Sequence, residues 1–126
     1  MAGKLNIKCN DFKENTSATF GSLREDKDFV DVTLACEDGQ QVGAHKVILA
    51  ASSPFFQKLL KRNHHPHPLI FMRNVSYENL DAMVDFFYFG EVNLLEQRLE
   101  SFLAIAEELQ LKGFSGENLE KEKKAD

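Results

Sequence analysis

The sequence predicts an α+β domain in which a small mixed sheet is flanked by helices. Its 126 residues are 43% hydrophobic and include eleven Phe, which fits one folded domain with a dense core. Short segments of alternating apolar and polar residues, the period of a strand, are interleaved with segments of helical period. The domain is expected to span residues 1–114, followed by a flexible charged tail or linker at 115–126.

The N-terminal segment predicts a strand followed by a helix. Leu5, Ile7 and Cys9 alternate with polar residues, and the helical stretch that follows leaves this strand without a hairpin partner. Its pairing partner must therefore lie elsewhere. Residues 11–25 have helical spacing, although Gly21 lowers their helix propensity. One side of this helix carries five residues, namely Phe12, Thr16, Thr19, Phe20 and Leu23.

A β-hairpin is predicted next. Apolar residues alternate with other residues through 30–36, which is the pattern of a strand with one buried face. Asp38 and Gly39 have the chemistry of a two-residue hairpin turn. Residues 40–44 then form the returning strand.

Two short helices and a strand follow the hairpin. Helical spacing runs through 45–51, after which Ser53 and Pro54 provide the cap and first residue of a second helix. Pro66 ends the helical region, because proline cannot continue a helix. The continuous apolar run at 69–72 is typical of a buried strand.

The last part of the chain predicts two further helices separated by a short strand. Ser76 caps a helix that ends before Gly90. Residues 92–94 predict a brief edge strand. A final helix over 99–109 is expected to be closed by Lys112-Gly113.

Composition excludes several classes of function. The net charge is −5, and no Lys/Arg stripe could follow a phosphate backbone, so this segment is not expected to bind nucleic acid directly. No run of about eighteen apolar residues suggests a membrane span. Cys9 and Cys36 form no C-x-x-C pair, and each fits an apolar parity, so both are expected to be buried rather than reactive.

Candidate reactive groups do not form a convincing active or metal site. His64, His65 and His67 lie in a proline-held loop, where adjacent side chains tend to point apart, so a solvated connector is favoured over a zinc site. Ser53 has a role as a helix cap and lacks the Gly-x-Ser-x-Gly pattern of a nucleophile. His45 is interpreted as a structural histidine at the start of its helix. A binding module is therefore favoured over an enzyme, with no cofactor or metal expected.

The stretch "DFVDVTLACEDGQQVGAHKVILAASSPFFQKLL" resembles the BTB/POZ domain, and the resemblance continues through "HPLIFMRNVSYENLDAMVDFFYFGEVNLLEQRLESFLAIAEELQLKG". It covers about residues 5–114. The combination of D-V-T-L, A-H-K-x-x-L-A-A-x-S-P-F-F and F-x-Y-x-G-E at these separations is highly specific. Within the family, the chain looks most like the arthropod subgroup of tramtrack-like and longitudinals-lacking-like regulators.

This resemblance implies a homodimer in which the N-terminal strand is exchanged between subunits and the first helix packs against its symmetry mate. The residues it assigns to the interface are Leu5, Ile7, Cys9, Phe12, Thr16, Thr19, Phe20 and Leu23. It also matches Asp31 and Lys46 to a charged pair that lines a pocket at the dimer groove. On this basis we expect these two side chains to form a partly buried ion pair.

Several residues depart from the subgroup pattern. Cys9 stands where Trp is usual, Thr16, Thr19 and Arg24 replace aliphatic residues of the dimer helix, and Gly21 loosens it. Because each patch of a symmetric interface faces its own copy, each lost methyl group counts twice. A dimer that is weaker or differently packed is expected.

The leading functional hypothesis from this resemblance is a dimerisation and interaction module of a nuclear transcription or chromatin regulator. Its partners would be a second copy, related BTB domains or corepressors. The first alternative is a substrate adaptor of a cullin-type ubiquitin ligase, which the basic stretch "QKLLKRNHHPH" disfavours. The second is a polymerisation module that adds the edge strand at 92–94 to a neighbouring sheet.

Overall fold

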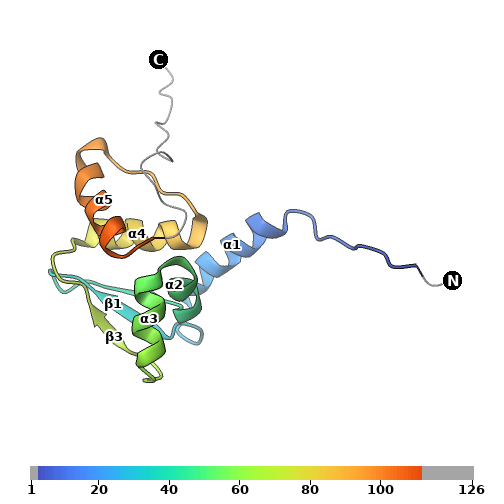
Figure 1. Ribbon diagram of the computed structural model, residues 1–126, viewed down its shortest axis with the longest axis horizontal. Helices are drawn as coiled ribbons and strands as arrows, with labels where there is room; N and C mark the ends of the chain where they lie inside the picture. Colours follow the sequence, from blue (N-terminus) through green and yellow to red (C-terminus); the bar gives the residue numbers. More distant parts are fainter. Residues whose placement is uncertain (1–2, 112–126) are drawn as a thin grey trace, which may run out of the picture.

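The computed structural model describes residues 3–111, and within them it confirms the α+β class. Figure 1 shows helices packed against a small sheet, with an N-terminal segment that runs away from the domain body. The helices are α1 (Phe12–Ser22), α2 (Lys46–Ser52), α3 (Pro54–Arg62), α4 (Tyr77–Phe89) and α5 (Leu99–Glu108), with short 3₁₀ helices at Leu23–Glu25 and Glu96–Arg98. The strands are β1 (Val32–Ala35), β2 (Gln41–Ala44) and β3 (Leu69–Phe71).

The sheet is mixed and has the strand order β2-β1-β3. Strand β1 pairs antiparallel with β2 through the predicted hairpin, and parallel with β3. In this register Leu34, at the centre of the sheet, is opposite both Val42 and Ile70. The parallel pair requires a crossover, which α2 and α3 supply.

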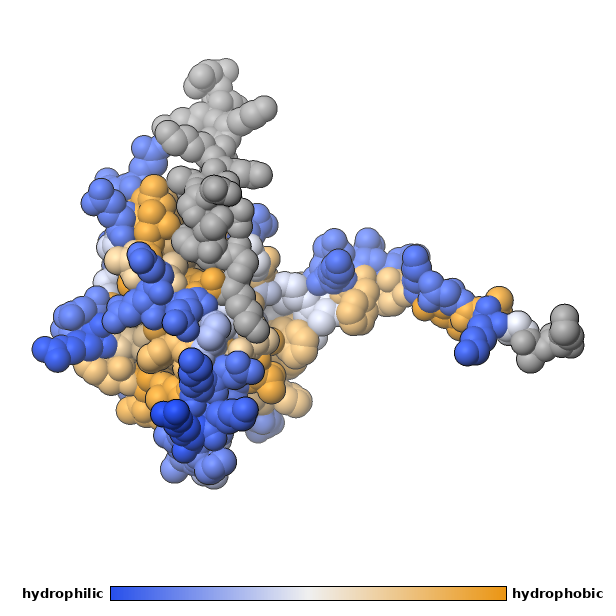
Figure 2. Space-filling view, in the orientation of Figure 1, coloured by the Kyte–Doolittle hydropathy of each residue, from blue (hydrophilic) through white to orange (hydrophobic). Residues whose placement is uncertain are grey.

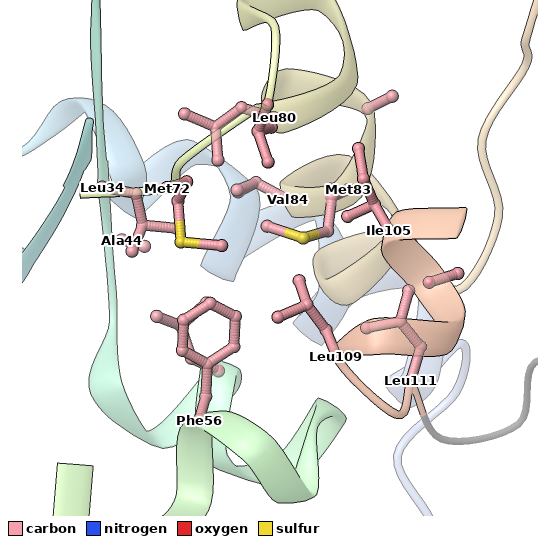
Figure 3. Close-up of a cluster of buried hydrophobic side chains, with 14 of the residues drawn as sticks. Leu34, Ala44, Phe56, Met72, Leu80, Met83, Val84, Ile105, Leu109 and Leu111 are labelled. Atoms are coloured by element: carbon pink, nitrogen blue, oxygen red, sulfur yellow. The ribbon is translucent and has the colours of Figure 1, made fainter. Parts of the chain in front are cut away.

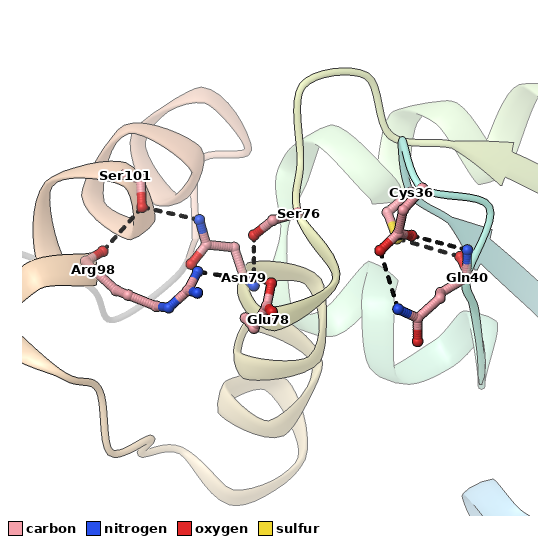
Figure 4. Close-up of polar contacts among 8 residues, drawn as sticks. Cys36, Gln40, Ser76, Glu78, Asn79, Arg98 and Ser101 are labelled. Carbon is pink, nitrogen blue, oxygen red and sulfur yellow. Dashed lines mark hydrogen bonds and ion pairs between the residues drawn. The ribbon is translucent and has the colours of Figure 1, made fainter.

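The hairpin turn contains three residues, 37–39, rather than the two that the sequence predicts. Cys36 N–H donates to the Gln40 carbonyl at 3.0 Å, and Gly39 N–H donates to the Cys36 carbonyl at 2.9 Å. Gly39 has a φ of 88°, a left-handed conformation that glycine adopts without strain. The Asp38 carboxylate closes the turn by accepting from Cys36 Sγ at 2.9 Å and from Gln40 N–H at 3.0 Å (Figure 4). These bonds hold the pKa of Asp38 below its usual value.

The predicted serine caps of α3 and α4 are confirmed. Ser53 Oγ accepts from the Phe56 N–H and also donates to the carbonyl of Leu109 at 2.6 Å, which joins α3 to the end of α5. Ser76 Oγ accepts from Asn79 N–H at 3.2 Å. The side-chain Nδ2 of Asn79 in turn donates to Ser101 Oγ at 3.0 Å, so α4 is joined to α5 (Figure 4).

One hydrophobic core lies between the sheet and the helices. Figure 3 shows Phe56 of α3, Met83 of α4 and Leu109 pointing toward one another. Leu34 of β1 reaches the same cluster, and Phe56, Met83 and Leu34 are fully buried. Each large side chain buried in this way contributes about 1.5–3 kcal/mol through removal of apolar surface from water. The core therefore fixes the positions of the helices that carry the surface features described below.

The prediction that β3 is a buried strand is wrong. Leu69 and Phe71 are 61% and 59% exposed, and Ile70 alone in this strand is partly buried. Successive side chains of a strand point to opposite faces, so Ile70 faces the core while Leu69 and Phe71 lie on the other face of the sheet. The strand therefore presents two large apolar side chains to solvent.

Two other predicted elements differ in the structure. Residues 92–94 form no strand within the described chain, because Val92 and Leu94 pack against the core without a neighbouring strand. Helix α5 ends at Glu108, and Gln110 adopts the left-handed conformation with a φ of 55°. The predicted stop at 112–113 and the tail at 115–126 lie outside the described residues.

The two serine caps give a matched test of this fold. Ser53→Ala removes a cap and also leaves the buried Leu109 carbonyl without its donor, so we expect a loss of about 2–3 kcal/mol in the free energy of unfolding. Ser76→Ala removes a cap alone and should cost about 1 kcal/mol. Urea denaturation of both variants measures the difference. Equal losses would contradict the joining role of Ser53.

Candidate functional site

Helix α1 has two faces, and one of them packs against α4. Ser17, Gly21 and Arg24 are spaced i, i+4 and i+7, which places them on this face. Ser17 Oγ donates to the Tyr88 carbonyl at 2.6 Å. A Cβ at Gly21 would lie 2.6 Å from Cζ of Phe89, so a larger residue at position 21 would push that ring aside.

Arg24 fastens the end of α1 to α4. Its Nη2 donates to Asp85 Oδ1 at 2.9 Å in an ion pair in which the Arg24 side chain is 17% exposed. Its guanidinium carbon lies 4.7 Å from the centre of the Tyr88 ring and 5.7 Å from that of Phe89. A partly buried guanidinium over an aromatic ring adds cation–π attraction to the ion pair. Burial and the charge of Asp85 raise the pKa of the neighbouring carboxyl of Asp81.

These contacts correct the interpretation of Gly21 and Arg24. The sequence comparison treated both as changes that weaken the dimer helix, but the structure places them on the opposite face, against α4. Gly21 permits close approach of two helices, and Arg24 joins them. Of the α1 residues that differ from the subgroup pattern, Thr16 and Thr19 lie on the outward face.

The outward face of α1 and the segment before it contain the residues predicted for the dimer interface. Figure 2 shows hydrophobic side chains gathered along one side of this projecting part of the chain. Leu5 and Ile7 are 89% and 90% exposed, and residues 3–9 form no strand within the described chain. The exposed members of the predicted set are Leu5, Ile7, Cys9, Phe12, Thr19 and Phe20, and the half-buried members are Thr16 and Leu23.

Asp31 and Lys46 are neighbours, but their side chains do not form the predicted ion pair. Asp31 Oδ1 accepts from the backbone N–H of Lys46 at 2.7 Å, at the first residue of α2. Lys46 Nζ donates instead to the His65 carbonyl at 2.7 Å. The carboxylate thus stabilises the N-terminus of α2, where the helix dipole favours a negative charge. The lysine tethers the loop that follows α3.

His45 and Tyr88 form a buried pair beside this position. The Tyr88 hydroxyl accepts from His45 N–H at 3.0 Å and lies 2.6 Å from His45 Nδ1. Burial raises the pKa of Tyr88, so its hydroxyl keeps the proton that it can share with the ring. His45 is thus structural, as predicted. The role of Tyr88 was missed, although it is the tyrosine of the F-x-Y-x-G-E motif.

The histidine-rich loop is held by hydrogen bonds. His65 Nδ1 accepts from His67 N–H at 2.9 Å, and His67 Nε2 lies 2.8 Å from Thr33 Oγ1 on β1. Within residues 3–111, no group of three or more His, Cys, Asp or Glu residues could hold a metal ion. The loop connects α3 to β3 and is fastened to both the sheet and Lys46.

The two cysteines lie in different environments. Cys36 is buried, as predicted, and its thiol pKa is raised by burial and by its hydrogen bond to the Asp38 carboxylate. Cys9 is exposed in the single chain, which contradicts its prediction as a buried residue there. None of the helices in the described part of the chain has the length and apolar character needed to cross a membrane.

The fold and this surface define an α+β domain with exposed apolar faces, in which the polar groups serve mainly to cap and join helices. The family model of the BTB/POZ domain matches residues 20–124, and the chain belongs to that family. Domains of this family mediate protein-protein interaction. The family match agrees with the resemblance inferred from the sequence motifs.

Curated relatives support the same assignment. The chain is 47% identical over 109 residues to the Drosophila melanogaster longitudinals lacking protein-like, covering 86% of this chain and 85% of that protein. It is 42% identical over 114 residues to the Drosophila Broad-complex core protein, and 42% identical over 112 residues to the Drosophila protein abrupt. Those matches span 16% and 12% of the relatives' own lengths, so this chain corresponds to a small part of them.

Solved structures share the fold. The BTB domain of zebrafish PATZ1 superposes with a TM-score of 0.75 at 19% identity, covering 86% of this chain and 89% of that one. The BTB domain of human Gigaxonin gives a TM-score of 0.74 at 22% identity, covering 87% of this chain and 90% of that one.

The bonds of Asp31 and Lys46 predict unequal effects of mutation. Asp31→Ala leaves the first N–H of α2 without its charged acceptor, so we expect a loss of about 1–3 kcal/mol in the free energy of unfolding. Lys46→Met removes an exposed contact to a carbonyl and should cost less than about 1 kcal/mol. Urea denaturation of both single variants and the double variant tests this. Strong coupling between the two mutations would show instead that the side chains form an ion pair.

Proposed function

We propose that this domain forms a homodimer through the outward face of α1 and the N-terminal segment. The observation that carries the proposal is the exposure of Leu5, Ile7 and Phe12, at 89%, 90% and 60%, on a part of the chain that projects from the domain. Apolar side chains gathered on a projecting segment gain stability when a partner covers them. Residues 5–9, which have the alternating pattern of a strand, would then pair with a strand of the second subunit.

The way α1 is anchored supports this arrangement. Its inner face is fixed on α4 by Ser17 and Arg24, so the outer face with Phe12 and Phe20 is held in one orientation. A surface that is already ordered loses less conformational entropy when it binds. Two such faces related by a twofold axis would form a self-complementary interface.

We further infer that the dimer serves a nuclear transcription or chromatin regulator. This inference rests on membership of the BTB/POZ family and on the resemblance to the tramtrack-like subgroup. Dimerisation would raise the effective concentration of two linked DNA-binding segments and so increase their avidity. The cullin-adaptor alternative has less support, because Lys58, Lys61 and Arg62 make the exposed side of α3 basic.

Light scattering tests the homodimer directly. At tens of micromolar, we expect a mass of twice the 14.3 kDa of the single chain. Phe12→Asp places a charge in the proposed interface and should weaken dimerisation at least about tenfold, as expected for an aromatic anchor. Phe71→Asp is the matched control, because Phe71 is 59% exposed and Phe12 is 60% exposed. A monomeric wild-type protein would refute the proposal.

Thiol labelling tests the exchanged N-terminal segment. Cys9 is exposed in the single chain, so it should react with Ellman's reagent in a monomer and be protected when a partner covers residues 5–9. Cys36 is buried with a raised thiol pKa and should stay unreactive in both states. We expect Cys9 to react at least about tenfold faster in Phe12→Asp than in wild type. If Cys9 reacts at the same rate in both proteins although the wild type is a dimer, the exchange of residues 5–9 is contradicted and the dimer itself is not.

A further inference from the structure

A second apolar surface lies between α3, β3 and the end of α5. It is a groove of about 370 Å³, which we call the α3–β3 groove, and its apolar lining includes Phe55, Leu59 and Phe71. These three side chains are 39%, 36% and 59% exposed. Figure 2 shows hydrophobic side chains in the region of α3 and β3, next to strongly hydrophilic ones.

The groove follows the open edge of the sheet. Four consecutive residues, Ile70 to Arg73, all line it. Ile70 and Phe71 are successive residues of β3 whose side chains point to opposite faces, so the groove reaches the edge of this strand, and Met72 and Arg73 extend its wall beyond the end of β3. Strand β3 pairs with β1 alone, which leaves the backbone N–H and C=O groups on its outer side available to another strand.

Two arginines and one glutamate lie at the groove, in a chain whose net charge is −5. Arg73 lines the groove, and Arg62 lies on the same side of α3 as Phe55 and Leu59, at spacings of i+7 and i+3. Both arginines are exposed, and the two ion pairs among residues 3–111 involve neither. Glu108 is the acidic residue in the lining.

We propose that the α3–β3 groove binds an extended, acidic peptide segment of a partner protein. The segment would add a strand beside β3, place apolar side chains against Phe55, Leu59 and Phe71, and direct its carboxylates toward Arg62 and Arg73. Arginine suits this role because its planar guanidinium can hold a carboxylate through two hydrogen bonds.

The chain's own N-terminal segment is a poorer occupant. Residues 5–9 are flanked and interrupted by Lys4 and Lys8, which would meet the two arginines with like charge. If a second copy inserted this segment into the groove, the segment would also be lost from the proposed dimer. The groove is therefore a surface for a different partner, and its use does not depend on the dimer face of α1.

Peptide titration of the intact chain tests this proposal. The probe is a fluorescein-labelled ten-residue peptide of alternating Glu and Leu, and the comparison peptide alternates Lys and Leu. We expect the acidic peptide to bind and to shift the amide NMR signals of α3 and β3. The double variant Arg62→Glu/Arg73→Glu should weaken its binding at least tenfold, and Phe71→Asp should weaken it several-fold.

Lys61→Glu is the matched control. Lys61 is exposed on the same helix as Arg62, but at helical spacing it points away from Phe55 and Leu59, so this variant should bind the peptide as wild type does. Equal binding of the basic peptide, or equal weakening by Lys61→Glu, would overturn the proposal, as would shifts confined to α1. Growth beyond a dimer that Phe71→Asp abolishes would assign the groove to a second copy instead. Light scattering of Arg62→Glu/Arg73→Glu distinguishes the use of the groove by a second copy from the absence of the proposed α1 dimer.

Discussion

Because Gly21 has no side chain, the ring of Phe89 lies directly against α1, and this close packing on α4 leaves the opposite face of α1 exposed. With Gly21 against α4 and Arg24 bonded to Asp85, the helix cannot turn its other side inward without losing both interactions. Phe12 and Phe20 are left outside as a consequence. The exposed apolar face thus follows from the packing of its opposite side.

Tyr88 connects this helix to the start of α2. Its carbonyl accepts from Ser17, its ring lies under the Arg24 guanidinium, and its hydroxyl bonds to the backbone and ring of His45. His45 directly precedes Lys46, whose N–H is held by Asp31. Residues from α1, α2, α4 and the segment before β1 therefore share one chain of contacts. A change in how α1 packs on α4 is expected to affect the position of Lys46 as well, because Tyr88 bonds both to Ser17 of α1 and to His45, the residue before Lys46.

Local signals in the sequence predicted most of the fold. Gly39, Ser53 and Ser76 act through bonds to residues within a few positions, so both caps and the place of the turn were predicted correctly, although the turn is one residue longer than predicted. Features that depend on distant partners were not. The apolar composition of β3 could not show that it lies at the sheet edge, and a basic side chain at position 24 gave no sign of Asp85, which is 61 residues away. Asp31 was placed correctly beside Lys46, but spacing cannot distinguish a backbone N–H from an ammonium group as its partner.

The two exposed apolar surfaces differ in charge, and symmetry makes that difference matter. At a twofold interface each group meets a copy of the same patch, so a basic surface would face a basic surface. Phe12, Thr19 and Phe20 on the outward face of α1 are uncharged, so in the proposed dimer they would meet their own copies without this repulsion. The α3–β3 groove is lined by Arg73 and Glu108 and has Arg62 beside it on α3, so an acidic molecule matches it better than a second copy does. Electrostatics therefore favours the outward face of α1 for the proposed self-association and the α3–β3 groove for the proposed different partner.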